Sequence, residues 1–100
     1  MKNSVYRVYI PNSVKRDIKK LDKAAQLAVL NLIRKISCFD YIGEKMTGQL
    51  CYLYKAKFSS HGVQYRIVYK INDENIEIRI VLVGTRENFY NEMKRRLKKA

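Results

Sequence analysis

The alternating pattern between Leu50 and Tyr69 constrains the fold more than any other part of this 100-residue sequence. Apolar residues alternate with polar ones on both sides of a stretch that favours turns, 59–62. Because successive side chains of a strand point to opposite faces, the segment predicts a β-hairpin with one apolar face. The opposite face gathers four cations with no carboxylate among them: Lys55, Lys57, Arg66 and Lys70. Such a surface is suited to hold an anion.

The net charge of the chain also indicates an anionic partner. The sequence has 21 Lys and Arg residues against 9 Asp and Glu residues, a formal charge of +12. Net charge bears on partners rather than on fold, and here it indicates nucleic acid, an anionic membrane surface or an acidic protein. A protein that is basic without such a partner is the alternative. The length fits a single domain, so we expect one domain over residues 1–100.

The sequence offers little for metal binding or membrane insertion. Cys38 and Cys51 do not form a disulfide framework, and His61 is the single histidine. This inventory cannot build a usual Cys/His zinc site, so we expect no metal and no cofactor. No apolar run approaches the length of a membrane span, and charge interrupts the first residues where a signal peptide needs an apolar core. We expect a reduced, cytoplasmic protein with no membrane partner.

The N-terminal half predicts a strand followed by two helices. Val5–Ile10 is rich in β-branched and aromatic residues, which favour a strand, and Pro11 ends it. A helix begins after Asn12 or Ser13, and a second runs over Lys23–Ser37. Apolar residues of the second helix cover a surface too broad for a lone surface helix, so it should face the sheet and either the first helix or a partner. Its main stripe is Ala24, Leu27, Leu30 and Ile33, widened by Val29, Leu32 and Ile36.

The C-terminal half predicts the rest of the sheet and one more helix. Cys38–Gly48 is expected to be a loop before the hairpin, and 72–75 a polar turn after it. Ile76–Val83 alternates as a strand, with Ile76, Ile78, Ile80 and Leu82 toward the core. A basic helix from about Glu87 ends the chain. The predicted class is α+β in the order β-α-α-β-β-β-α, an antiparallel-rich twisted sheet with helices packed over one face.

Three segments of the chain resemble the RelE/ParE superfamily of bacterial toxins, and the order of elements matches too. The segments are 53–57 (Leu-Tyr-Lys-Ala-Lys), 65–69 (Tyr-Arg-Ile-Val-Tyr), and 83–86 (Val-Gly-Thr-Arg) with Tyr90. The resemblance implies a RelE-like toxin of a type II toxin–antitoxin system. RelE-like members are ribosome-dependent endoribonucleases that cut mRNA in the A site. ParE-like members inhibit DNA gyrase and generally lack the cationic set on the sheet.

The resemblance implies a catalytic site on the concave face of the sheet. Its residues are Lys55, Lys57, Arg66, Arg86 and Tyr90. Further RNA contacts are expected from Lys70, Arg79, Lys94 and Arg95. The chain departs from some relatives, which have a histidine where it has Thr85, and the loop between Lys57 and Arg66 looks slightly longer than theirs.

The implied chemistry places demands on these residues. In RNA cleavage by the 2′-hydroxyl, a base must deprotonate that oxygen, charge on the phosphorane must be stabilised, and the leaving 5′-oxygen must be protonated. Clustered cations lower the pKa of a lysine, which lets it serve as a base. The expected roles are Lys57, helped by Lys55, as base or as orienting group for the 2′-hydroxyl, and Arg66 on the phosphorane. Arg86 would hold the phosphate and assist the leaving oxygen, and Tyr90 would stack on or orient a nucleotide.

Three other interpretations stay open at this point. In the first the chain is a ParE-like gyrase inhibitor, and in the second it is a non-catalytic nucleic-acid-binding protein. In the third it is a family member that keeps the fold without toxicity. As a RelE-like toxin it has two implied partners, mRNA on the ribosome and a cognate acidic antitoxin in a hetero-oligomer. The high positive charge agrees with both partners.

Overall fold

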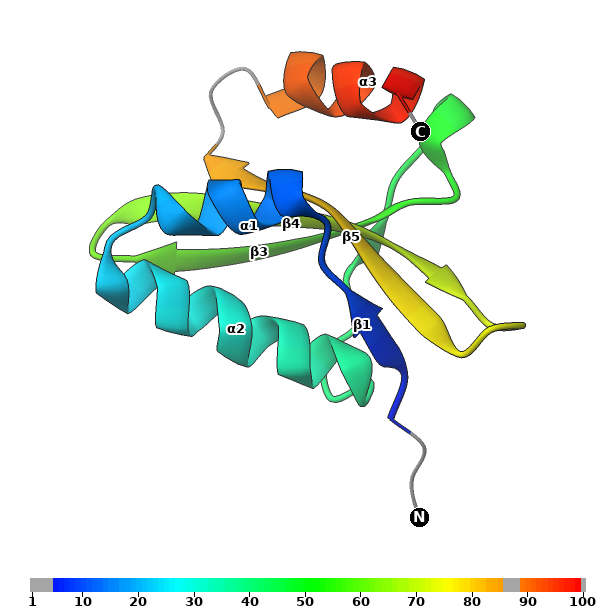
Figure 1. Ribbon diagram of the computed structural model, residues 1–100, viewed down its shortest axis with the longest axis horizontal. Helices are drawn as coiled ribbons and strands as arrows, with labels where there is room; N and C mark the ends of the chain where they lie inside the picture. Colours follow the sequence, from blue (N-terminus) through cyan, green and yellow to red (C-terminus); the bar gives the residue numbers. More distant parts are fainter. Residues whose placement is uncertain (1–4, 86–88, 100) are drawn as a thin grey trace.

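The computed structural model describes residues 5–85 and 89–99, which form an α+β domain with the predicted order of elements (Figure 1). The short strand β2 lies where the sequence predicts only a loop, and the 3₁₀ helix η1 spans the end of that loop and Leu50, the first residue of the predicted hairpin. The elements are β1 (Arg7–Tyr9), α1 (Asn12–Lys19), α2 (Lys23–Ser37), β2 (Glu44–Lys45), η1 (Gly48–Leu50), β3 (Tyr54–Ser60), β4 (Val63–Asn72), β5 (Glu77–Thr85) and α3 (Phe89–Lys99). The strands form one sheet in the order β1-β5-β4-β3-β2, in which only β1–β5 is parallel.

The central β3–β4 hairpin has the predicted faces. Lys57 pairs with Arg66 across the two strands, and Ala56 pairs with Ile67 on the opposite face. The connection is tighter than the sequence predicts, because Ser59 and Ser60 belong to β3. His61 and Gly62 make a two-residue turn with φ of 50° and 79°. Two successive positive φ values are typical of a type I′ turn, whose twist matches that of the flanking strands.

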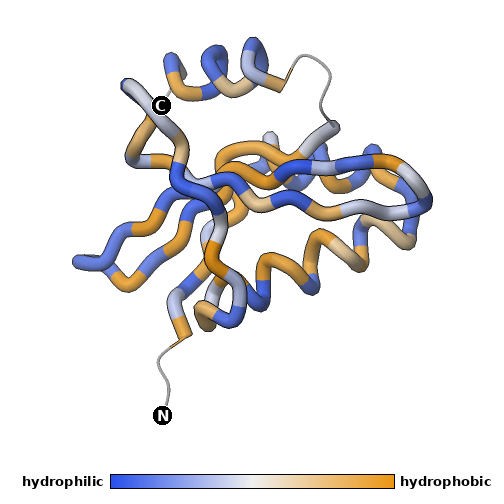
Figure 2. The backbone as a smooth tube through the Cα atoms, turned by 180° about the vertical axis from the view of Figure 1, so that it is seen from behind, coloured by the Kyte–Doolittle hydropathy of each residue, from blue (hydrophilic) through white to orange (hydrophobic). Residues whose placement is uncertain are grey.

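Helices cover both faces of the sheet, so the prediction of helices over one face is wrong for α3. The alternation of hydrophobic and hydrophilic residues along the strands is visible in Figure 2. The core beneath α1 and α2 includes Val14, Ile33 and Ile67. On the opposite face, α3 contributes Phe89 and Met93 to a second core with Leu53, Val68 and Leu82. The cationic face of the hairpin therefore also carries an apolar patch, and α3 covers that patch.

A bulge in β5 explains why one predicted core residue changes sides. Tyr69 pairs with Ile80 and Val68 pairs with Leu82, so Val81 is an extra residue in the ladder. Ile80 stays in the core beneath α1 and α2, but Leu82 turns toward α3. The predicted strict alternation from Ile76 to Leu82 is therefore wrong beyond the bulge. A bulge forms through pairing with the partner strand, so the pattern of one strand does not reveal it.

Several residues predicted to be buried lie at the surface. Ile76 has φ 53° and is 48% exposed, because it closes the turn before β5 rather than opening the strand. Leu27 and Leu30 are exposed, and Ala24 is too. The face of α2 that packs on the sheet contains Ile33 and the residues predicted to widen the stripe: Val29, Leu32 and Ile36. A wide apolar surface does not fix the rotation of a helix about its axis.

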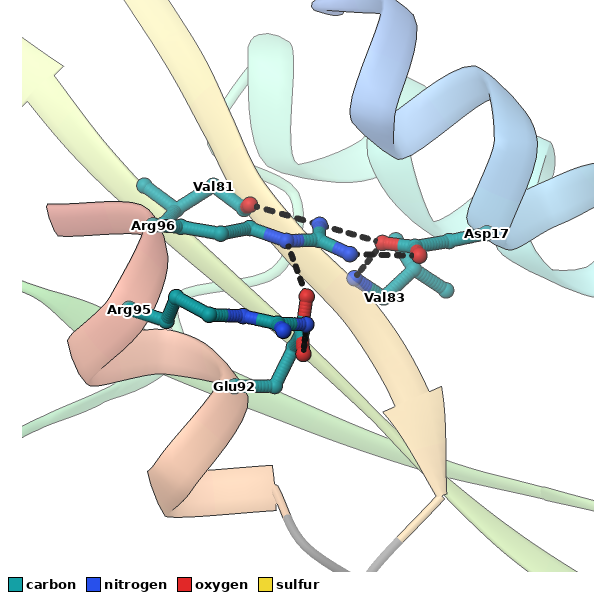
Figure 3. A network of polar contacts seen from close by, with 6 residues as sticks. All are labelled: Asp17, Val81, Val83, Glu92, Arg95 and Arg96. Carbon is teal, nitrogen blue, oxygen red and sulfur yellow. Dashed lines mark hydrogen bonds and ion pairs between the residues drawn. The ribbon is translucent and has the colours of Figure 1, made fainter. Parts of the chain in front are cut away.

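The edge of β5 beyond its short pairing with β1 is closed by an ion pair between α1 and α3 (Figure 3). Asp17 accepts hydrogen bonds from Arg96 at 2.6 and 2.8 Å and from the Val83 amide at 3.2 Å. Arg96 also donates to the Val81 carbonyl oxygen at 3.2 Å. The two groups thereby satisfy backbone atoms that no strand pairs. The hydrogen bonds that Arg96 donates to Asp17 raise the pKa of Arg96 and outweigh the opposing effect of burial.

A close approach at Gly43 fixes β2 beside β3. The Gly43 amide donates to the Tyr69 hydroxyl at 2.8 Å. A Cβ at this position would lie 2.6 Å from that hydroxyl oxygen and 2.8 Å from the Lys55 carbonyl oxygen. Only glycine fits there without moving the backbone of β3, so this residue sets the place of the loop that ends in β2.

We expect Arg96→Ala to lower the free energy of unfolding by about 2–3 kcal/mol, because it leaves the Asp17 carboxylate buried and unpaired. Urea titration followed by circular dichroism measures this. Arg95→Ala is the matched control, since Arg95 pairs with Glu92 but its side chain is 67% exposed, and exposed pairs contribute about 1 kcal/mol or less. Equal stability of the two variants would contradict the role of the ion pair.

We expect Gly43→Ala to lower the free energy of unfolding by about 1–3 kcal/mol through overpacking against Tyr69 and Lys55. Gly84→Ala is the control, because a Cβ there meets no atom within 4 Å. Chemical denaturation of both variants checks the prediction. A Gly43 variant as stable as the Gly84 variant would contradict the prediction, because it would show that the backbone of β3 moves at this point with little cost in free energy.

Candidate functional site

Three of the predicted catalytic residues lie together on the face of the hairpin that α3 partly covers. Lys57 and Arg66 are direct cross-strand partners, and Lys55 precedes Lys57 on the same face. The Lys57 side chain is 54% exposed. The Arg66 guanidinium carbon lies 5.9 Å from the centre of the Phe89 ring, a cation–π arrangement. Because Phe89 is buried, the start of α3 gives Arg66 a fixed surface to rest on.

The first turn of α3 also brings Tyr90 to the lysines. The Tyr90 ring is 53% exposed, and its centre lies 6.0 Å from that of Phe89 in an edge-to-face contact. Tyr90 and Lys55 line one small pocket of about 220 Å³, together with the strand β2 and the residues after it. We call this cavity the lysine–tyrosine pocket. The remaining lining residues are Glu44, Lys45, Met46, Thr47 and Leu50.

Glu44 is a site residue that the sequence does not predict. In β2 it is the cross-strand partner of Lys55, and its Oε1 lies 3.9 Å from Nζ of Lys57. The cationic face therefore has a carboxylate beside it, which corrects the expectation of a face without one. Both side chains are more than half exposed, so the contact adds little to stability. The sequence carries no signal for this contact, because a two-residue strand is too short to show a pattern.

Arg86 falls outside the described residues, and its role remains a prediction. The last described residue of β5 is Thr85, and its neighbour Gly84 pairs with Arg66. The chain thus leaves the sheet next to the cationic cluster.

The four additional predicted RNA contacts do not join this cluster. Lys70 and Arg79 pair with each other near the β4–β5 turn, and Lys70 is four residues from Arg66, roughly 13 Å along the strand. Arg79 lies over the Tyr9 ring, with its guanidinium carbon 4.4 Å from the ring centre. Arg95 faces a cleft of about 470 Å³ between α1 and α3. Lys94 lines a separate groove between α3 and the segment that contains η1.

The site contains cations, one carboxylate and an exposed aromatic ring. Guanidinium and ammonium groups on one strand pair can hold a phosphate, and the Glu44 carboxylate can accept a proton. Within the described ranges, no group of three or more His, Cys, Asp and Glu side chains is placed to hold a metal ion. No helix in the described part of the chain is long and apolar enough to cross a membrane.

Solved structures with a similar fold come from toxin–antitoxin systems. A chain of the RelBE2 toxin–antitoxin complex from Mycobacterium tuberculosis has a TM-score of 0.71 and 25% identity, covering 83% of this chain and 100% of that chain. A mutant of the Escherichia coli toxin RelE in the free state has a TM-score of 0.75 and 21% identity, covering 94% and 99%. A chain of the intact E. coli RelBE complex has a TM-score of 0.64 and 23% identity, covering 82% and 98%.

The family of the chain follows from its sequence. A comparison with curated proteins gives no match. A family model described as "ParE-like toxin of type II bacterial toxin-antitoxin system" matches residues 8–94. This span runs from β1 into α3 and includes the described residues of the cationic cluster. The chain therefore belongs to the ParE-like toxin family of type II toxin–antitoxin systems, in the RelE/ParE superfamily, and it has the fold of RelE toxins.

Proposed function

We propose that this toxin is a ribosome-dependent endoribonuclease that cleaves mRNA in the A site and thereby arrests translation. The observation that supports the proposal is the pairing of Lys57 with Arg66 on one sheet face, with Lys55 and Tyr90 lining the pocket beside them. By the resemblance, gyrase-inhibiting relatives generally lack this cationic set. A protein that acts only by binding gyrase does not need it.

The cross-strand pair supplies a place for the scissile phosphate. Side chains of directly opposed residues start about 5 Å apart, so Lys57 and Arg66 can contact the same phosphate. Arg66, which rests on the Phe89 ring, stabilises the charge that develops on the phosphorane. Tyr90 stacks on a nucleotide next to it. Arg86 is the remaining proposed phosphate contact.

The proton acceptor in this proposal is either Lys57 or Glu44. Without RNA, the Glu44 carboxylate faces the Lys57 ammonium group at 3.9 Å. A bound phosphate competes with Glu44 for this ammonium group. The released carboxylate can then take the proton of the 2′-hydroxyl as its oxygen bonds to phosphorus, while Lys57 holds the phosphate. The bond from phosphorus to the 5′-oxygen breaks, and this leaving oxygen takes a proton from water. Because the nucleophile is the 2′-hydroxyl of the RNA itself, this route does not require a metal ion.

The partners of the proposed toxin are mRNA on the ribosome and an acidic antitoxin. Membership in a toxin family of type II toxin–antitoxin systems supports the antitoxin. Two of the structural neighbours are themselves toxin–antitoxin complexes. The charge of +12 suits an acidic partner in a hetero-oligomer. A substrate on the ribosome places the toxin in the cytoplasm.

Inhibition of DNA gyrase is the second candidate function. The observation that favours it is the family model, whose description is ParE-like. The two functions differ in what they leave intact. A gyrase inhibitor arrests replication while mRNA remains whole, and an mRNA endoribonuclease produces new 5′ ends on translated messages.

We expect Lys57→Ala, Arg66→Ala and Arg86→Ala each to lower mRNA cleavage at least about 100-fold and to relieve growth arrest, because each removes a contact to the reacting phosphate. Mapping of mRNA 5′ ends after brief induction, with and without active ribosomes, measures this. Lys35→Ala on the exposed side of α2 is the control. Cleavage by all three folded variants would contradict the proposal, and intact mRNA with arrested replication would favour gyrase inhibition.

We expect Glu44→Gln to lower the single-turnover rate on programmed ribosomes about 100-fold, because it removes the proposed proton acceptor and keeps the shape of the side chain. Binding of RNA should not weaken, since a negative charge leaves the site. Glu74→Gln in the exposed β4–β5 turn is the matched control. An unchanged rate in Glu44→Gln would assign the base to Lys57 instead.

A further inference from the structure

A groove beside α3 adjoins the lysine–tyrosine pocket. Its walls are α3 and the segment from Thr47 to Tyr52, and its volume is about 610 Å³. Thr47 and Leu50 line both this groove and the lysine–tyrosine pocket. We call it the α3 groove. A strand of RNA with its phosphate at the cationic cluster therefore has this groove nearby.

The side chains of the α3 groove combine apolar, aromatic and cationic groups. Leu50 and Leu97 are half-buried, and the Tyr52 ring is 49% exposed. Lys94 and Lys98 stand on successive turns of α3, about 6 Å apart along the helix axis. None of the seven lining residues is acidic: Thr47, Gln49, Leu50, Tyr52, Lys94, Leu97 and Lys98. The groove is complementary to an extended anion that has flat apolar parts.

Tyr52 is much more exposed than two other tyrosines of the central hairpin region. Tyr65 and Tyr69, both in β4, are buried. Tyr52 instead follows η1 at the surface. An exposed aromatic ring next to lysines is the usual arrangement for binding single-stranded nucleic acid, because bases stack on the ring while cations contact the backbone.

We propose that the α3 groove binds the nucleotide next to the cleavage position of single-stranded RNA, with its base stacked on Tyr52 and the flanking phosphates on Lys94 and Lys98. The inference rests on the proposed function, since it takes RNA as the substrate. The amide of Gln49, at the edge of the groove, is available to the base edge. The groove thus extends RNA recognition from the reacting phosphate to a neighbouring base.

A peptide segment of an acidic antitoxin is the competing occupant. Two features favour RNA. The groove shares Thr47 and Leu50 with the pocket that Lys55 and Tyr90 line. In addition, its apolar lining is limited to two half-buried leucines and one ring, whereas a docked amphipathic helix places several apolar anchors in a groove.

Binding of 2′-O-methyl RNA tests the proposal, because methylation blocks the nucleophile and separates binding from cleavage. Fluorescence anisotropy of the whole toxin with a labelled hexanucleotide gives the affinities. We expect Tyr52→Ala to weaken hexanucleotide binding about tenfold, the loss of one stacked base. Tyr52→Phe keeps the ring and should bind as the wild type does. Hexanucleotide affinity unchanged in Tyr52→Ala would overturn the proposal.

The salt dependence of binding tests the two lysines. We expect Lys94→Gln and Lys98→Gln each to reduce the slope of log affinity against log salt by about 0.7, as for one lost phosphate contact. Lys35→Gln, on α2, should leave the slope unchanged. Slopes of the Lys94 and Lys98 variants equal to that of the wild type would overturn the proposal.

Two outcomes separate this inference from its premise. A toxin that binds the hexanucleotide through Tyr52 but cleaves no translated mRNA leaves the groove standing and refutes the proposed function. Variants at Tyr52 and Lys94 that weaken binding of an acidic antitoxin peptide, but not of the hexanucleotide, would show that the groove takes a peptide and would overturn the inference.

Discussion

The ion pair between Asp17 and Arg96 joins α1, α3 and the edge of β5, three parts of the fold that strand pairing does not connect. Strand β1 pairs only with the first residues of β5, and no other strand in the described part of the chain pairs with the rest of that edge. Asp17 from α1 and Arg96 from α3 bind the edge at Val83 and Val81 and bind each other. One carboxylate and one guanidinium thereby connect helices that cover opposite faces of the sheet. This arrangement also keeps the edge from pairing with another chain.

The position of α3 determines what the cationic face can do. Once Arg96 is anchored, the apolar side of α3 lies on Leu53 and Val68, and its first turn brings Phe89 beneath Arg66 and Tyr90 beside Lys55. A bare cationic sheet would bind any polyanion. With α3 in place, Arg66 rests on the Phe89 ring, and Lys55 lines a pocket with Tyr90. Such fixed positions favour binding of one phosphate in a defined geometry over non-specific binding of any polyanion.

Electrostatics shape both the site and its surroundings. The excess of 12 positive charges attracts anionic partners from a distance, but it does not define the proposed site. The local arrangement of charges does so, because β2 holds Glu44 opposite Lys55 and the contact of Gly43 with Tyr69 holds β2 in place. In the α3 groove nearby, the lining has cations without a carboxylate. In the proposed mechanism the carboxylate stands where a proton is taken, and the groove provides the contacts to the RNA backbone.

Local pattern was enough to predict the hairpin. The alternation around Lys55, Lys57 and Arg66 predicted which side chains share a face, because the two-residue period of a strand is a property of the backbone. The α+β class and the order of elements followed from patterns of the same kind. The resemblance to a toxin family added Tyr90, which no local pattern connects with a strand more than 30 residues away.

The sequence by itself determined the strands, the helices and the cationic face of the hairpin, since each depends on side chains close together along the chain. Only the tertiary structure decided which face α3 covers, that Leu82 turns toward it at a bulge, and that Glu44 and Tyr52 belong near the site. These features depend on pairing between distant strands and on where apolar surface remains uncovered once the sheet has formed. Such contacts leave no periodic signal in the residues that make them.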